Sequence, residues 1–478
     1  MSEFTSNWWA QSKSRSQATT AAFLVLALVL GGISYFIWSS PSSPVRGVVN
    51  AAVEAVNPLS GENTVLKKNL TTAHKTISTQ QGKITALQQK VVASQASTAK
   101  QLAEAQQRAM TAENALAQAK AQLAGASGTK AHAASGTKSG SGGGTAAAPI
   151  TAPSKAQLVQ PATRYFGMYT DQAPFNWATF DATSAKIGVQ PNVVGYFSGW
   201  DETFRANAVT RAWQAGRMPM MTWESRPIDA GNDTNVAPDY SLSKIISGSF
   251  DAYLHQYAKD IVSTGLPLAI RLDHEMNGVW YPWAENDGQG KSINGNSSGE
   301  YVQMWRHVHD IFQAEGANNL VMWVWSPNIV NNLPASHQAD GYLNALYPGD
   351  AYVDWVGLSG YLRPPYKSDN DFSFNYTFKP SLDKLRSITS KPIMLSEIGA
   401  SETDGHKPAW INSFFTALGK PENDDIIGFS WFNLAVTSYV EGVRATNDWR
   451  IDSRADSLSA FITGLTKPED KFTLTPAK

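Results

Sequence analysis

The chain has 478 residues, a formal net charge of −1 at pH 7 and no cysteine. It is longer than one ordinary domain, so we expect several regions of different character. The near-zero charge argues against a general binder of nucleic acid, because no strong basic field is present to hold phosphates. The absence of cysteine excludes disulfides, thiolate metal sites and a cysteine nucleophile, but it leaves the cellular compartment open.

The first predicted element is an apolar segment at residues 21–38, within a stretch from 16 to 45 that has no charged residue. A helix of that length approaches the roughly 30 Å thickness of bilayer hydrocarbon. Lys13 and Arg15 precede the segment and Arg46 follows it, a weak bias that favours a cytoplasmic N-terminus. We expect a single-pass membrane anchor, with residues 1–20 cytoplasmic and the rest periplasmic or extracellular. A cleaved signal peptide is the alternative.

Two further regions follow the apolar segment. In residues 60–123, apolar and small residues recur in steps of three and four, which is the a/d pattern of a coiled coil. The pattern predicts a stalk through which copies of the chain self-associate. Ala, Gln, Ser and Thr occupy many of its core positions, so a monomeric helical spacer is the alternative. Residues 124–160 are rich in Gly, Ala, Ser, Thr and Pro, and we expect a flexible linker there.

The remaining block, residues 161–468, is predicted to be one large α/β domain. It contains eight short apolar runs, separated by segments with helical periodicity such as 250–263, 299–314 and 408–418. The runs are residues 165–169, 193–197, 219–223, 268–272, 320–325, 355–358, 393–395 and 427–431. Repeated strand–helix units predict a parallel sheet, and eight of them predict closure as a (β/α)8 TIM barrel. An open doubly wound sheet is the alternative, although the G-x-G-x-x-G fingerprint is absent.

Two of the predicted strands run into a glutamate. Side chains alternate along a strand, so Arg271 and Glu275 share one face of the first of them, and Glu397 ends the second. In this kind of barrel the chemistry lies at the C-terminal ends of the strands. We therefore expect Arg271, Glu275 and Glu397 to converge there. Charges in such a place are costly unless they are paired or used, so a structural Arg–Glu ion pair is the alternative.

Two other hydrolytic chemistries fail on spacing. A zinc-protease helix of the form H-E-x-x-H needs a histidine where this chain has Gly278. A serine-hydrolase elbow of the form G-x-S-x-G is missed because Ser198 stands one position too far from Gly195. We expect no metal ion and no cofactor.

A pair of carboxylic acids remains, and this pair matches the cleavage of glycosides. In a retaining glycosidase one carboxylic acid protonates the departing oxygen and one carboxylate attacks the anomeric carbon. Sugar rings also stack on aromatic faces, and this chain has many aromatic residues near its predicted strand ends. They are Trp223, Trp280, Tyr281, Trp283, Trp325 and Trp431.

Three segments of this block resemble glycoside hydrolase family 26, the family of β-mannanases and some related β-glucanases and xylanases. Residues 274–283 (HEMNGVWYPW) are similar to its acid/base strand, and residues 392–399 (PIMLSEIG) to its nucleophile strand. Residues 356–361 (VGLSGY) are similar to its sixth strand. The matches occur in the family's order and extend from about residue 164 to 464, so the resemblance covers the last block alone.

The resemblance implies a retaining endo-β-glycanase in which Glu275 is the general acid/base and Glu397 the nucleophile. It also implies that His274 and Trp280 line the site, that Tyr361 hydrogen-bonds to Glu397, and that Trp431 forms a sugar platform. For these roles Arg271 and Tyr361 should favour the charged form of Glu397. Burial and the neighbouring negative charge should keep Glu275 protonated.

One departure from the family pattern concerns the substrate. Many mannanases of the family carry an aspartate where this chain has Ser359, so the sugar stays open between a β-1,4-mannan and a related β-glycan. With the predicted anchor, we expect a polysaccharide near the cell's own surface as the partner. The alternatives are a catalytically silent, glycan-binding barrel in an envelope complex, and a protein whose principal function is the coiled coil.

Overall fold

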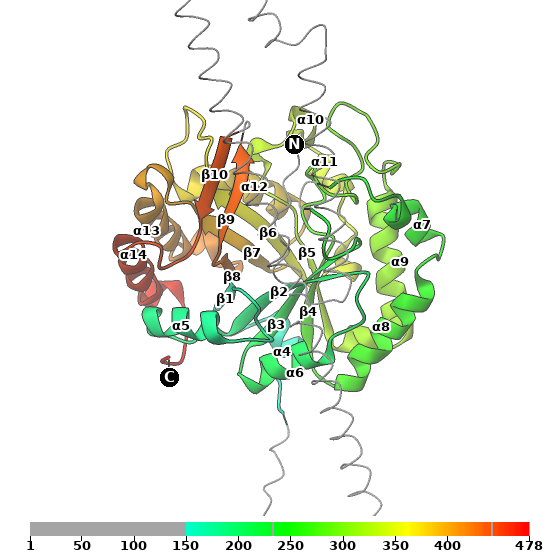
Figure 1. Cartoon of the computed structure of the whole chain (residues 1–478), viewed down its shortest axis with the longest axis horizontal. Helices are drawn as coiled ribbons and strands as arrows, with labels where there is room; N and C mark the ends of the chain where they lie inside the picture. Colours follow the sequence, from blue (N-terminus) through cyan, green and yellow to red (C-terminus); the bar gives the residue numbers. More distant parts are fainter. Residues whose placement is uncertain (1–149, 232–233, 441–442, 478) are drawn as a thin grey trace, which may run out of the picture. The chain divides into compact units, whose positions relative to one another are not determined.

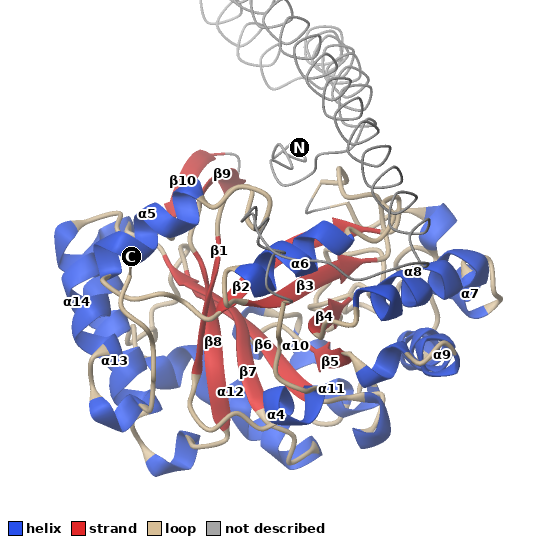
Figure 2. Ribbon diagram, turned by 90° about the horizontal axis from the view of Figure 1, so that it is seen from below, coloured by secondary structure: helices blue, strands red, loops and turns tan. Residues whose placement is uncertain are grey.

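The computed structural model describes residues 150–231, 234–440 and 443–477. Within this part of the chain, eight parallel strands close into a barrel. Each strand pairs with the next in chain order, and β8 pairs back to β1. Figures 1 and 2 show the strands at the centre of the domain and the helices around them. The predicted eight-stranded barrel is therefore confirmed.

The strands coincide closely with the predicted apolar runs, and several extend beyond them. They are β1 (Tyr165–Tyr169), β2 (Val193–Gly199), β3 (Met218–Glu224), β4 (Leu268–Leu272), β5 (Val321–Trp325), β6 (Trp355–Leu362), β7 (Ile393–Ala400) and β8 (Ile426–Phe432). Nearly every residue in them is buried. Parallel strands covered by helices on one face and packed inside a barrel on the other produce continuous apolar runs of this kind.

The helices bury one stripe each against the barrel. They are α4 (Lys155–Val159), α5 (Ala178–Ile187), α6 (Ala206–Gln214), α7 (Leu242–Ile246), α8 (Asp251–Thr264), α9 (Glu300–Ala314), α10 (Ala335–Gln338), α11 (Tyr342–Ala345), α12 (Phe374–Ile388), α13 (Lys407–Leu418) and α14 (Ala455–Leu465). In α9 the buried residues include Tyr301, Trp305, Val308 and Phe312, at steps of four, three and four. This spacing places them on one face of the helix.

The expected boundaries of the last domain are wrong at both ends. Helix α4 lies inside the stretch that was expected to be flexible linker. Leu158 of α4 is buried, and its carbonyl accepts a 3.0 Å hydrogen bond from the hydroxyl of Tyr165. At the other end, the backbone of Phe472 forms a bridge with that of Arg164. The domain therefore begins before residue 161 and continues beyond 468, because a few apolar contacts anchor segments whose composition is otherwise polar.

An antiparallel hairpin that was not predicted follows β8. It consists of β9 (Ala435–Val440) and β10 (Val443–Asp448). The hairpin lies in the connection between β8 and α14, and Figure 1 shows it in orange-red. The segment from its end to α14 returns to the barrel and contributes to the site described below.

The predicted anchor at residues 21–38 and the predicted coiled coil at residues 60–123 lie outside the described residues, as does most of the predicted linker. Among the helices of the described part of the chain, none combines the length and the apolar character that crossing a membrane requires.

Candidate active site

Glu275 stands just beyond the end of β4, in a segment of unusual backbone conformation. Asp273 and Glu275 have φ angles of 39° and 56°, values that non-glycine residues seldom adopt. The backbone N–H of Glu275 donates to the carbonyl of Ser326, at the end of β5, at 2.7 Å. Such conformations persist where the surroundings hold them, and they cluster at functional sites. The side chain of Glu275 therefore points in a direction that a regular continuation of β4 would not give it.

Glu397 lies within β7, and two donors hold its carboxylate. Arg271 donates from Nη1 to Oε2 at 2.7 Å, and the hydroxyl of Tyr361 donates to Oε1 at 2.5 Å. The register between β7 and β8 shifts between Leu395 and Ile398, so the strand is irregular at the glutamate. The carboxylate is buried and has a charged donor on one oxygen and a neutral donor on the other. This is an environment that supports an ionised carboxylate.

The guanidinium of Arg271 links the two glutamates. Its Nη1 binds Glu397, and its Nη2 lies 4.0 Å from Oε1 of Glu275. Arg271 is fully buried, and its remaining donors reach hydroxyl groups from neighbouring strands. Those hydroxyls belong to Thr222 at 3.2 Å, Ser326 at 2.9 Å and Ser359. Burial opposes the charge of Arg271, yet the charges around it, led by that of Glu397, raise its pKa above the ordinary value.

Glu275 has a different environment from Glu397. The indole Nε1 of Trp280 donates to its Oε2 at 2.9 Å. Burial raises the pKa of Glu275, and the negative charge of Glu397 raises it further, while Arg271 opposes both. The carboxyl of Glu275 is thus suited to hold a proton. The directions are those expected for a general acid beside a nucleophile.

A second layer of charged and aromatic groups lies behind Glu275. His274 is fully buried, and burial together with the charge of Arg271 holds the pKa of its imidazole well below the ordinary value. Its ring packs against Tyr281 with centroids 4.9 Å apart. Arg226 lies over the face of Tyr281 and forms a buried ion pair with Glu224 at 3.1 Å. Burial therefore favours the neutral form of His274, and the side chain is too deeply buried to line the site as predicted.

The structure places four of the predicted substrate-binding tryptophans in the core. Trp223, Trp283, Trp325 and Trp431 are each fully buried. Their indoles contact helices and loops of the outer layer. Trp223 stacks on Tyr257 of α8 at 4.4 Å, Trp325 donates to the carbonyl of Leu346, Trp283 to that of His274, and Trp431 to that of Trp449. None of these four offers an open face to a sugar, which corrects the expectation of a platform at Trp431. Trp280 and Tyr361 are the aromatic residues of the predicted set that stay partly exposed.

Several residues of the site carried no signal in the sequence. Thr222 and Ser326, which bind Arg271, are hydroxyl residues of a kind that is common in any strand. Ser326 also contacts Ser396 of β7, with 2.8 Å between their hydroxyl oxygens. Trp449 lies far along the chain from both glutamates, yet its ring packs against that of Tyr361. Only the closure of the barrel brings these residues together.

Comparison with known families agrees with this geometry. Residues 222–403 match the model of the family described as Glycosyl hydrolase family 26. The chain carries a glycosyl hydrolase family 26 domain. The matched range begins within β3, ends just after β7 and includes Arg271, Glu275, Tyr361 and Glu397, whereas Trp449 lies outside it.

Individual relatives of the family 26 domain differ in their named activities. Endoglucanase H of Acetivibrio thermocellus is 31% identical over 281 residues, which are 57% of this chain and 27% of the relative. The mannan endo-1,4-beta-mannosidase of Bacillus subtilis is 25% identical over 263 residues, which are 50% of this chain and 66% of the relative. The chain thus spans about a quarter of the first relative and just under two thirds of the second. A solved structure of a Bacillus subtilis mannanase aligns with 21% identity and a TM-score of 0.40, covering 58% of this chain and 83% of that one.

Proposed function

We propose that the barrel is a retaining endo-β-glycanase that hydrolyses a β-1,4-mannan or a related β-glycan. In this proposal Glu275 is the general acid/base and Glu397 the nucleophile. The observation that carries it is the unequal environment of the two buried carboxyls. Arg271 donates to Glu397 at 2.7 Å and Tyr361 donates to it as well, whereas the guanidinium lies 4.0 Å from Glu275, which accepts from the neutral N–H of Trp280.

The two environments fit the two steps of a double displacement. In the first step the carboxylate of Glu397 attacks the anomeric carbon, and Glu275 gives its proton to the departing glycosidic oxygen. The glycosyl ester that forms removes the negative charge from Glu397, so the pKa of Glu275 falls and its carboxylate becomes a base. In the second step Glu275 takes a proton from the attacking water, and the ester is broken with net retention at the anomeric carbon.

The choice between sugars rests on the relatives. One is named an endoglucanase and another a mannan endo-1,4-beta-mannosidase. A β-glycan backbone is the substrate class that these names share, and we propose that class for this chain.

We further propose that residues 21–38 anchor the chain in a membrane with the N-terminus cytoplasmic, and that residues 60–123 self-associate as a stalk. The uncharged apolar stretch and the three–four periodicity support these proposals. Under them the barrel works on polysaccharide close to the membrane, on its periplasmic or extracellular side.

Reducing-sugar release from a panel of β-mannans, mixed-linkage β-glucans and xylans tests the proposed activity. We expect turnover on at least one of these β-linked polymers, and loss of that turnover in Glu397→Ala. Binding to a polymer in a pull-down without any release of reducing ends would replace the proposal with a catalytically silent, glycan-binding barrel.

A further inference from the structure

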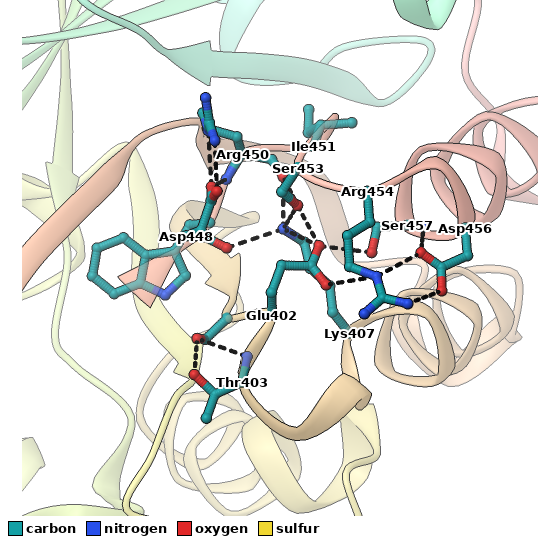
Figure 3. A network of polar contacts seen from close by, with 12 residues as sticks. Glu402, Thr403, Lys407, Asp448, Arg450, Ile451, Ser453, Arg454, Asp456 and Ser457 are labelled. Carbon is teal, nitrogen blue, oxygen red and sulfur yellow. Dashed lines mark hydrogen bonds and ion pairs between the residues drawn. The ribbon is translucent and has the colours of Figure 1, made fainter. Parts of the chain in front are cut away.

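A buried lysine that the proposed chemistry does not use lies at the start of α13. Lys407 has no exposed surface, and oxygen atoms surround its ammonium (Figure 3). Its Nζ donates to the carbonyls of Asp448 and Arg450 at 3.2 and 2.6 Å and to the hydroxyl of Ser453 at 2.8 Å. A carboxylate oxygen of Glu402 lies 3.2 Å away. Burying an ammonium is costly unless it is paired and hydrogen-bonded, and this one is both.

The carbonyls that Lys407 binds belong to the residues on either side of Trp449. The carbonyl of Trp449 itself accepts a 2.6 Å hydrogen bond from the indole of Trp431 in β8. Three successive carbonyls, those of Asp448, Trp449 and Arg450, are therefore held by side chains from α13 and β8. The backbone N–H of Trp449 is also bound, to the carbonyl of Leu434 at 2.9 Å. These hydrogen bonds restrain the backbone of residues 448–450. They therefore restrain the direction in which the Trp449 side chain leaves the backbone.

The indole of Trp449 lies against the residue that orients Glu397. Its ring packs on that of Tyr361 with centroids 5.0 Å apart. Both side chains approach Gly399, two positions beyond Glu397 in β7. A Cβ at Gly399 would meet Tyr361 at 3.1 Å and Trp449 at 3.2 Å, so the absence of a side chain there admits both rings. The contacts thus form a continuous series from Lys407 through Trp449 and Tyr361 to the carboxylate of Glu397.

We propose that Lys407 is a positioning residue for the nucleophile: it fixes Trp449 against Tyr361, and Tyr361 thereby holds Glu397 in the orientation for attack. The inference rests on the proposed function and adds to it a residue about ten positions beyond the nucleophile that touches neither glutamate. The hairpin-to-α14 segment becomes part of the catalytic support, although it lies outside the range matched by the family model.

Glu402 completes the support from the loop between β7 and α13. Its Oε1 accepts from the hydroxyl of Ser457 at 2.8 Å and also contacts that of Ser453. Burial lowers the pKa of Lys407 to about 8, and Glu402 opposes the shift. The ammonium thus joins the loop after β7, which holds Glu402, to the loop after β10, which holds Trp449.

A double-mutant cycle on the full chain tests the inference. The variants are Lys407→Met, Tyr361→Phe and the two combined, with kcat and KM measured on the glycan that the wild type hydrolyses. Each assay is run well below the variant's own unfolding temperature. We expect Lys407→Met to lower kcat about tenfold while KM changes less than threefold. In the Tyr361→Phe background Lys407→Met should lower kcat less than threefold, because the effects of substitutions at residues that act through one another are not additive. Lys407→Arg, which keeps the charge and the donors, should recover most of the loss.

Lys155→Met is the matched control. Lys155 also joins two segments, through the carbonyl of Asn318 at 3.0 Å and the carboxylate of Asp354 at 2.9 Å, but these partners precede β5 and β6, at the opposite end of the barrel strands from the loops that hold Glu402 and Trp449. It should lower the unfolding temperature and leave kcat unchanged. If Lys407→Met does not fold, Trp449→Leu replaces it in the cycle with the same expectation.

Three outcomes are decisive. Additive losses from Lys407→Met and Tyr361→Phe would overturn the inference and leave the proposed function intact. An unchanged kcat in Lys407→Met, with a lower unfolding temperature, would do the same and make Lys407 purely structural. A wild-type chain that hydrolyses none of the glycans would overturn the proposed function, and this inference with it.

Discussion

Arg271 donates to the carboxylate of Glu397 at 2.7 Å in a pair that is buried at the mouth of the barrel. The partners come from β4 and β7, two strands that have β5 and β6 between them in the barrel. The same guanidinium lies near Glu275, so one cation sets the electrostatic conditions of both acids. We therefore expect the pair to affect both the proposed activity and the stability of the fold.

Loss of Arg271 should affect both activity and stability. In Arg271→Met the carboxylate of Glu397 is buried without its charged partner, which costs about 3–5 kcal/mol when a buried pair is broken. We expect a lower free energy of unfolding in urea and a fall in kcat of at least about 100-fold. Arg271→Lys should recover part of the stability and little of the activity, because a single ammonium cannot reach the hydroxyls of Ser326 and Ser359 as well. Equal activity in Arg271→Lys and the wild type would contradict this role.

Azide should distinguish the two glutamates. Glu397→Ala and Glu275→Ala should each remove nearly all turnover on a polymeric substrate. With an activated aryl glycoside and azide, the Glu397 variant should form a glycosyl azide of inverted configuration, because azide takes the place of the missing nucleophile. The Glu275 variant should form the azide of retained configuration. Mass spectrometry and NMR of the product identify each one, and an exchange of the two outcomes would reverse the assigned roles.

The pH profile should depend on Trp280. With Glu275 as the proposed acid, activity should fall as pH rises through its pKa, which burial and the charge of Glu397 place above the ordinary value. The indole N–H of Trp280 donates to the carboxyl of Glu275 and favours its charged form. Trp280→Phe removes that donor, so the pKa should rise and the alkaline limb of kcat/KM should move to higher pH. A shift to lower pH would show that the hydrogen bond favours the protonated acid.

The sequence predicts the barrel well because burial on both faces makes every strand a continuous apolar run. Strands β1 and β4 have the predicted bounds, and the others differ at their ends. The hairpin of β9 and β10 was missed because neither of its strands is a continuous apolar run like those of the barrel. Helix α4 was missed because a single buried leucine, Leu158, anchors it within a low-complexity stretch.

The two glutamates were predicted from alternation along regular strands, and the structure reaches their positions by a different route. Glu275 follows residues of positive φ beyond the end of β4, and Glu397 lies at an irregularity in β7. The tryptophans were predicted from their places near strand ends and not from alternation, and alternation explains why four of them are buried instead. Trp223 adjoins Thr222, whose hydroxyl binds Arg271, so the indole points to the opposite face, toward α8. Sequence alone could not say which face of each strand is the inner one.

Asp470 should make the stability of the domain depend on pH. Its carboxyl is fully buried with no hydrogen-bond partner for either oxygen, and burial raises its pKa from 3.8 to about 7. The folded state therefore holds a proton that the unfolded state releases between these values, so this group's contribution to stability is lost as pH rises through about 7. Asp470→Asn should raise the free energy of unfolding at pH 8 by about 1 kcal/mol or more and leave it nearly unchanged at pH 4.

Urea unfolding at several pH values measures this effect. Asp340→Asn is the control, because its carboxylate is on the surface beside Lys384, which lowers its pKa. Asp340→Asn should leave the change in the free energy of unfolding between pH 5 and 8 as it is in the wild type. If Asp470→Asn does not reduce this pH dependence of the free energy of unfolding, the carboxyl of Asp470 is ionised in the folded state at neutral pH.

The stereochemistry of hydrolysis tests the central claim most directly. The reducing ends released from a β-linked oligosaccharide can be followed by proton NMR in the first minutes, before mutarotation equilibrates the anomers. Double displacement through Glu397 and Glu275 predicts that the β-anomer appears first and the α-anomer grows in later. Appearance of the α-anomer first would contradict the account, because it would show a single displacement by water with no glycosyl ester on Glu397.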